Sequence, residues 1–155
     1  MRCCRQNLID WEYVGDALTA RPSWIADDVG MWVPDSQHFN GQYYLYYTAP
    51  WTDVPGGGSA IGVLMAPHLA GPWTASGGPV VEPHDADCCP GARRWVFDAS
   101  IVTDESGQRW ISYGSYFGGT WTHRLGAHAR IGLVSMGGAD FTAEFDYVRV
   151  YRLHS

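Results

Sequence analysis

Asp98 has the clearest chemical setting of any side chain in this sequence. It stands at the mouth of an expected strand, with Trp95 and Phe97 before it and Tyr116 and Phe117 after the next expected strand. A carboxylate beside aromatic rings is a common way to build a sugar site, because the rings cover the sugar face and the acid meets its polar edge. Spacing alone favours a simpler role, in which the aspartate only caps a turn.

Trp32, Asp35 and His38 form a second group of candidates. Trp32 is a candidate stacking platform for a sugar, or else a ring packed in the core. Asp35 follows a proline at an expected turn, so accepting backbone hydrogen bonds is favoured for it over catalysis. His38 is a candidate polar contact to a ligand, or else a surface imidazole with its partners already supplied.

Two predicted hairpins must position these side chains. In the first, residues 99–103 and 109–113 alternate as strands do, and Asp104-Glu105-Ser106-Gly107 supplies the turn between them. In the second, Asn40-Gly41 is a type I′ turn signal and precedes the strongly β-prone run Tyr43–Thr48. The candidate residues are therefore expected on and around β-strands.

Composition limits the class of protein. The 155 residues suit one domain, and 46% hydrophobic residues argue against disorder. An aromatic share of 14%, with 19 Gly and 9 Pro, fits short strands joined by many turns, so an all-β fold is expected.

The net charge is −6 and no basic cluster occurs beyond Arg93-Arg94, so nucleic acid is not an expected partner. No apolar run has the length of a membrane span or of a signal peptide, so neither a membrane partner nor export is predicted from this chain.

The cysteines and the glycine-rich loop do not indicate a metal or a cofactor. Cys3-Cys4 and Cys88-Cys89 are vicinal pairs without the spacing by which one turn supplies two zinc ligands. Unpaired thiols and a bridge between the pairs both remain open. Gly56-Gly57-Gly58 lacks the lysine and the helix start of a phosphate loop, so it is interpreted as a flexible loop. We expect no metal and no cofactor.

The run FDASIVTDESGQRWISYGSYFGG, residues 97–119, resembles the hairpin of glycoside hydrolase family 43. That family has an Ile-Asp-Pro-Ser start, an acidic turn with glycine and a Tyr-Gly-Ser end, and the likeness is greatest to its arabinan-degrading members. Matched residue by residue, Asp98 falls on the second essential aspartate, which tunes the pKa of the general acid and orients it. Ala99 replaces the family's proline, which would fix φ at about −65°, so Asp98 is expected to be held less rigidly.

Further segments are similar to the same family. The run MWVPDSQHFNGQYYLYYTA, residues 31–49, is similar to its Trp-Ala-Pro-Asp segment and the strand that follows. The resemblance implies substrate-binding roles for Trp32, His38, Ser115, Tyr116 and Phe117, and leaves Asp35 as a weak catalytic candidate.

The resemblance also implies a domain organisation. Residues 1–125 are expected to form a partial five-bladed β-propeller of about two and a half blades. Residues 126–155 resemble the terminal strands of the laminin-G or concanavalin-like sandwich that follows the propeller in many relatives. We therefore expect an internal gap at about Gly126, with the segment that carries the general acid missing. A cut propeller exposes strand edges, so self-association through Tyr43–Thr48 and Ile111–Ser115 is expected.

The implied activity is inverting hydrolysis of O-glycosidic bonds in arabinan or other arabinose-containing plant polysaccharides. Asp10 and Asp16 do not match the general-base motif, and Glu82 lies in an earlier blade than the family's acid, so neither the base nor the acid is identified. This chain is therefore expected to be inactive alone. Two alternatives are a non-catalytic carbohydrate-binding module that uses Trp32, Tyr116 and Phe117, and a ligand-free structural fragment. Full-length relatives are typically secreted.

Overall fold

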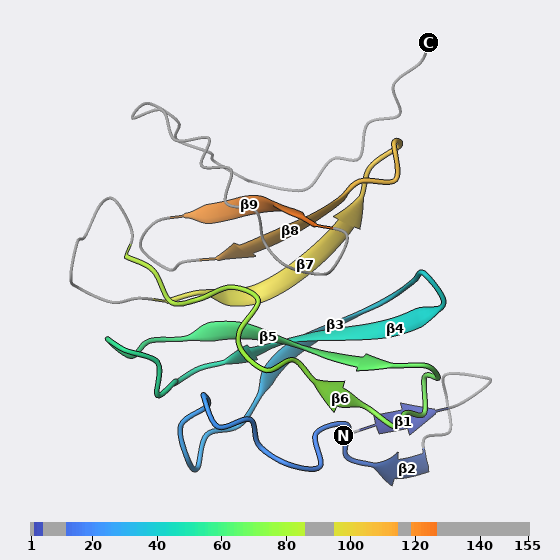
Figure 1. Cartoon of the computed structure of the whole chain (residues 1–155), viewed down its shortest axis with the longest axis horizontal. Coiled ribbons are helices and arrows are strands. Elements are labelled where there is room, and N and C mark those ends of the chain that lie inside the picture. The colour runs from blue at the N-terminus through green and yellow to red at the C-terminus, as the bar shows by residue number, and fades with distance from the viewer. Residues whose placement is uncertain (1, 5–11, 86–94, 115–118, 127–155) are drawn as a thin grey trace.

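The computed structural model describes residues 2–4, 12–85, 95–114 and 119–126. This part of the chain contains strands and no helix (Figure 1), which confirms the expected all-β class. The strands are β1 (Arg2–Cys4), β2 (Glu12–Gly15), β3 (Trp32–Phe39), β4 (Gln42–Ala49), β5 (Ala60–Ala66), β6 (Thr74–Ala75), β7 (Phe97–Thr103), β8 (Arg109–Gly114) and β9 (Thr120–Leu125).

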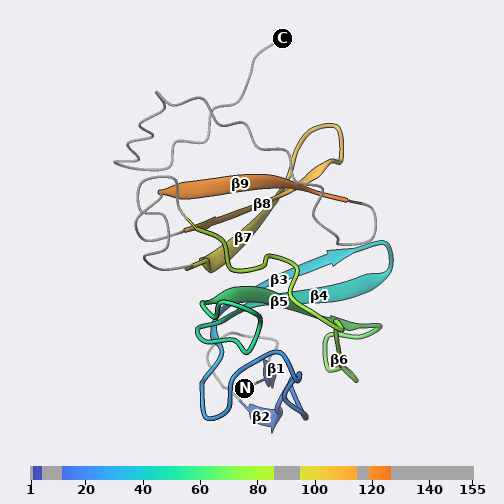
Figure 2. The same ribbon diagram turned by 60° about the vertical axis from the view of Figure 1, so that its left-hand side comes forward.

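The strands form three antiparallel sheets in chain order. β1 pairs with β2, the second sheet has the order β3-β4-β5-β6, and the third has the order β7-β8-β9. The four-stranded sheet lies between the other two in both views (Figures 1 and 2). Blades of a propeller pack face to face in this way, each as a small antiparallel sheet. The structure therefore has the character of a partial propeller.

Both predicted hairpins form, and local chemistry explains each turn. Asn40 and Gly41 have φ of 50° and 72°, the two positive values that a type I′ turn requires. At the other turn, one Asp104 oxygen accepts hydrogen bonds from Ser106 and Gln108, and the other accepts one from Trp110. The hydrogen bonds, those of Ser106 first, lower the pKa of Asp104 to about 2.

We expected Tyr43–Thr48 and Ile111–Ser115 to lie at exposed sheet edges, and this expectation is wrong. Tyr43–Thr48 lies in β4, which pairs with β3 on one side and β5 on the other. The described part of the other segment, Ile111–Gly114, lies in β8, which pairs with both β7 and β9. Both runs are central because each is flanked by two strands close in sequence. Among the described strands of these two sheets, the edges are β3, β6, β7 and β9.

The hydrophobic core has two parts, one on each face of the four-stranded sheet. The larger part lies between this sheet and β7-β8-β9, and it includes Tyr46, Ile61, Val63, Ile101 and Ile111. The smaller part lies on the opposite face, where Trp24 and Ile25 pack on Tyr47 and Leu64. β4 contributes side chains to both parts, as expected for a strand buried on both faces.

Several predictions fall outside the described residues. Cys88-Cys89 and almost all of the 126–155 segment are among them, and the side chains of Cys3 and Cys4 are not described either. The state of the cysteines and the domain division at Gly126 therefore stay predictions.

Candidate functional site

Asp98 lies at the start of β7 on a bulge that turns its side chain outward. The pairing of β7 with β8 shifts between Phe97 and Ser100, and Asp98 has a φ of 58°. Bulges re-aim side chains and are common beside active sites. The Asp98 side chain is exposed. Its backbone amide donates a hydrogen bond of 3.0 Å to Oγ1 of Thr48 in β4, so its backbone position is nevertheless fixed.

Trp32 is the first residue of β3, as Phe97 is of β7, and the two side chains meet. Its side chain is 49% exposed and stacks on Phe97, with ring centroids 6.0 Å apart and an interplanar angle of 19°. Trp95 meets the same phenylalanine edge-on at 5.5 Å. Trp32, Phe97 and Trp95 therefore form an aromatic row immediately beside Asp98. The structure thus brings together two of the predicted site residues, Trp32 and Asp98.

Three side chains of the four-stranded sheet hold the β7 segment by its backbone amides. The amide of Val96 donates to Oγ of Ser59 at 2.7 Å, that of Asp98 to Thr48, and that of Ile101 to an Asp35 carboxylate oxygen at 2.7 Å. Alternate amides of a strand point the same way, and the bulge adds one residue between the second and third of these donors. The Thr48 bond sets the position of Asp98 relative to the neighbouring sheet, whereas Ser59, directly before β5, and Asp35 hold other residues of the segment.

Asp35 is a half-buried connector between the two sheets. Besides the amide of Ile101, its carboxylate accepts hydrogen bonds from the side-chain amide of Gln37 at 3.2 and 3.3 Å. The same Gln37 nitrogen lies 3.4 Å from the carbonyl oxygen of Ile101. A carboxylate with both oxygens engaged in this way acts as a structural acceptor between the two sheets.

Of the remaining predicted residues, His38 lies away from the aromatic row. His38 is exposed near the hairpin end of β3, paired with Tyr43, and its ring tilts against that tyrosine at 4.3 Å. Six residues of extended strand separate it from Trp32, which is about 20 Å. Ser115, Tyr116 and Phe117 lie outside the described residues.

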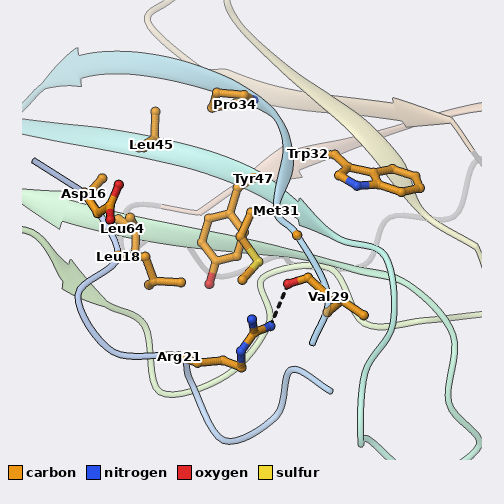
Figure 3. A pocket seen from close by; sticks show the side chains of 12 residues that line it. Asp16, Leu18, Arg21, Val29, Met31, Trp32, Pro34, Leu45, Tyr47 and Leu64 are labelled. Atoms are coloured by element: carbon orange, nitrogen blue, oxygen red, sulfur yellow. Dashed lines mark hydrogen bonds between the residues drawn. The ribbon is translucent and has the colours of Figure 1, made fainter. Parts of the chain in front are cut away.

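A cavity of about 610 Å³ opens on the opposite face of the four-stranded sheet. Figure 3 shows Leu18, Met31 and Tyr47 facing into it, with Trp32 at one end. Arg21 donates a hydrogen bond of 2.8 Å to the Val29 carbonyl at its rim. Burial raises the pKa of the Tyr47 phenol to about 12, so the phenol stays neutral. The lining is mainly apolar, and residues 16–31 form the side opposite the sheet.

His84, Tyr113 and His123 form a buried polar network that sequence reasoning missed. The Tyr113 hydroxyl lies 2.9 Å from Nε2 of His84 and 2.7 Å from Nε2 of His123. Nδ1 of His84 lies 3.3 Å from the Asp85 carbonyl, which only accepts, so that nitrogen carries a proton. In neutral His84 the other nitrogen then accepts from Tyr113, and Tyr113 in turn accepts from Nε2 of His123.

Burial has a consequence for the two inner members of this network. His123 is 5% exposed, and its Nδ1 has no hydrogen-bond partner among the described residues. Desolvation, and second the nearby His84, lower the pKa of His123. Desolvation also raises the pKa of Tyr113. A signal existed in the sequence. His123 is two residues from Leu125, and Tyr113 is two residues from Ile111, so in a strand each polar side chain shares the face of an apolar one. That pattern places His123 and Tyr113 on the inward face.

Within the described ranges, no three His, Cys, Asp or Glu side chains come close enough to hold a metal ion together. The same part of the chain has no helix long and apolar enough to cross a membrane.

Packed antiparallel sheets with exposed aromatic rings and a carboxylate at their strand mouths are typical of carbohydrate-active β-proteins. Residues 5–137 match the model of Glycosyl hydrolases family 43, and the chain belongs to this family. The expected family is therefore confirmed.

Individual relatives support the same assignment. The chain is 30% identical over 131 residues to the extracellular exo-alpha-(1->5)-L-arabinofuranosidase ArbA of Cellvibrio japonicus, covering 77% of this chain and 35% of that protein. It is 29% identical over 139 residues to an extracellular endo-alpha-(1->5)-L-arabinanase of Thermotoga petrophila, covering 80% and 28%. The chain thus spans about a third of the length of these relatives.

A solved structure agrees with the fold. An alpha-L-arabinanase of Cellvibrio cellulosa, in complex with arabinohexaose, superposes with a TM-score of 0.67 at 25% identity and covers 84% of this chain and 42% of its own. An exo-1,5-alpha-L-arabinanase from a bovine ruminal metagenomic library, at 22% identity, has the same fold with a TM-score of 0.64.

Proposed function

We propose that this chain forms part of the arabinan-binding cleft of a family 43 glycoside hydrolase. The observation that carries the proposal is the row of the exposed Trp32 and the half-buried Phe97 and Trp95 beside the exposed side chain of Asp98. A row of aromatic faces suits a chain of sugar rings, and a carboxylate at its side suits their hydroxyl groups. The relatives that act on α-1,5-linked arabinan, and the neighbour that binds arabinohexaose, favour arabinose as the sugar.

In this proposal Asp98 is the supporting aspartate of an inverting hydrolysis. Inversion needs a general acid for the leaving oxygen and a general base for the water, with their carboxyl groups about 6.5–9.5 Å apart. Asp98 would orient the acid and keep it protonated. Its left-handed backbone and its hydrogen bond to Thr48 support this role, because a group that orients another must itself be held.

The isolated 155-residue chain is proposed to bind without hydrolysing. Its four glutamates are Glu12, Glu82, Glu105 and Glu144, and none stands in a segment that resembles the family's acid motif. A catalytic carboxylate is worth about 10²–10⁴-fold in rate, so turnover without both is expected near background. Asp35, a weak catalytic candidate, already has both oxygens occupied.

Arabinohexaose titration by tryptophan fluorescence, together with a reducing-sugar assay on linear arabinan, tests this proposal. Binding without hydrolysis is the expected result, and Asp98→Asn should leave the hydrolysis background unchanged. Hydrolysis that disappears in Asp98→Asn would show that the chain has its own base, and would refute the proposed inactivity. No binding would refute the arabinan cleft and leave a ligand-free structural fragment.

The second candidate is a carbohydrate-binding module that never takes part in catalysis. The exposure of Trp32, 49%, is the observation that favours it, since a stacking platform needs only an accessible ring. Titrating the chain with arabinan, xylan and cellulose fragments separates the two roles. A binding module should bind xylan or cellulose fragments about as well as arabinan, whereas a hydrolase cleft should prefer the arabinose polymer.

We also propose that residues 126–155 belong to a separate sandwich-type unit. Leu125, the last residue of β9, is 4% exposed and pairs with Arg109, while Gly126 is exposed. In this proposal the first unit ends with β9, whose last residue is buried, although the family match continues to residue 137. Deleting residues 126–155 should leave the thermal unfolding midpoint of the remainder unchanged, and a clear fall would refute the division.

A further inference from the structure

Thr48 lies between the two exposed groups of the candidate cleft. It belongs to β4, its side chain is completely buried, and it is the cross-strand partner of Trp32. Its Oγ1 accepts the hydrogen bond from the backbone amide of Asp98, at 3.0 Å. One buried threonine is thus paired with Trp32 across the sheet and bonded through its hydroxyl to the backbone amide of Asp98.

The backbone of Asp98 needs such a connection. Its φ of 58° is in the left-handed region, which is uncommon for residues other than glycine and is kept only where the surroundings impose it. The next residue is Ala99, whose ring-free backbone does not restrict the preceding residue as a proline does. The covalent chain therefore does not hold Asp98 in this conformation. The hydrogen bond to the buried Thr48 does.

We propose that Thr48 is a positioning residue that fixes the direction of the Asp98 side chain relative to Trp32, and so sets the cleft for an α-1,5-linked arabino-oligosaccharide. This inference rests on the proposed function. Without the bond, we expect the Asp98 backbone to leave the left-handed conformation, which changes the direction of its side chain relative to the aromatic row.

Three variants of the full chain test this role. Thr48→Val keeps the shape and removes the acceptor, Thr48→Ser restores an acceptor, and Ser59→Ala removes the neighbouring acceptor that holds Val96. We expect Thr48→Val to weaken arabinohexaose binding about tenfold, the scale of one unsatisfied amide. Thr48→Ser and Ser59→Ala should stay within about twofold of the parent, because neither changes the bond to Asp98. Circular dichroism confirms that each variant is folded.

Amide hydrogen exchange provides a second readout that needs no ligand. In Thr48→Val the Asp98 amide should exchange at least about tenfold faster than in the parent, while the Ile101 amide, held by Asp35, keeps its rate. Equal acceleration at Ile101, or parent-like binding by Thr48→Val, overturns the proposal, as does an equal loss of binding in Ser59→Ala. If the parent does not bind arabinohexaose, the proposed function fails, and the exchange rates alone decide whether Thr48 holds Asp98.

Discussion

Removing the Tyr113 hydroxyl should destabilise the protein, because it bridges two imidazoles in the core. In Tyr113→Phe, Nε2 of His123 loses its partner at 2.7 Å, and Nδ1 of the same ring already has none among the described residues. The ring is 5% exposed, so water does not replace the lost bond. Leaving one buried polar group unsatisfied costs about 1–3 kcal/mol. His84 is half-buried and regains a water partner, so it adds little.

The matched control is His123→Leu combined with Tyr113→Phe. Removing both partners of a buried hydrogen bond is far less costly than removing one, so the double variant should recover most of the stability lost in Tyr113→Phe. Urea unfolding at pH 8 measures the free energies of unfolding. In thermal unfolding, a loss of 1 kcal/mol should lower the melting midpoint by about 2–4 °C in a chain of this size. Equal stability of parent and Tyr113→Phe would refute the network.

The same network predicts how stability depends on pH. The pKa of His123 is lowered in the folded state, so between that pKa and the unfolded value of 6.5 the unfolded chain binds a proton that the folded chain does not. Stability therefore rises with pH in this window and falls on acidification below 6.5, by at most about 1.4 kcal/mol per pH unit. The charged form of His84 adds to the penalty. His123→Leu should flatten this slope, and an unchanged slope would contradict the assignment.

Three further predictions follow from other parts of the structure. Trp32→Ala should weaken arabinohexaose binding by about 1–2 kcal/mol, measured by calorimetry, whereas Leu69→Ala, an equally exposed apolar residue on a distant loop, should have no effect. Asp104→Ala should lower stability above pH 4, and the difference from the parent should shrink as the pH falls through the lowered pKa of about 2, where the parent carboxylate becomes protonated; a constant difference in urea midpoint would refute this. β9, an edge among the described strands of its sheet, should pair with other chains at micromolar concentration, and a monomer at every dilution in light-scattering chromatography would contradict it.

The hairpins were predictable from sequence because their signals are local. Asn40-Gly41 selects its turn through two positive φ values, and Asp104 closes the other turn with side-chain oxygens within six residues. Short apolar strands between such turns allowed the all-β class to be inferred. The family followed from the same segments, since their motifs combine turn chemistry with strand alternation.

The arrangement between strands was not predictable in the same way. Thr48 and Asp98 are 50 residues apart in the chain, and Asp35 and Ile101 are 66 apart. No periodicity in either segment reports such a contact. The central position of Tyr43–Thr48 was missed for a related reason, because an edge strand and a central strand of similar composition differ only in what pairs beside them.

The bulge that directs Asp98 occurs twice in the structure. β3 begins Trp32-Val33 and β7 begins Phe97-Asp98, and both strands shift their pairing within the next residues. The second residue has a positive φ in both, 38° for Val33 and 58° for Asp98. A β-branched residue does not adopt this conformation by preference, so the surrounding sheets impose it at Val33. The bulge is therefore a shape that the first residues of β3 and β7 share, and at the β7 copy the sequence adds the carboxylate of Asp98 and the Thr48 hydroxyl that holds its amide.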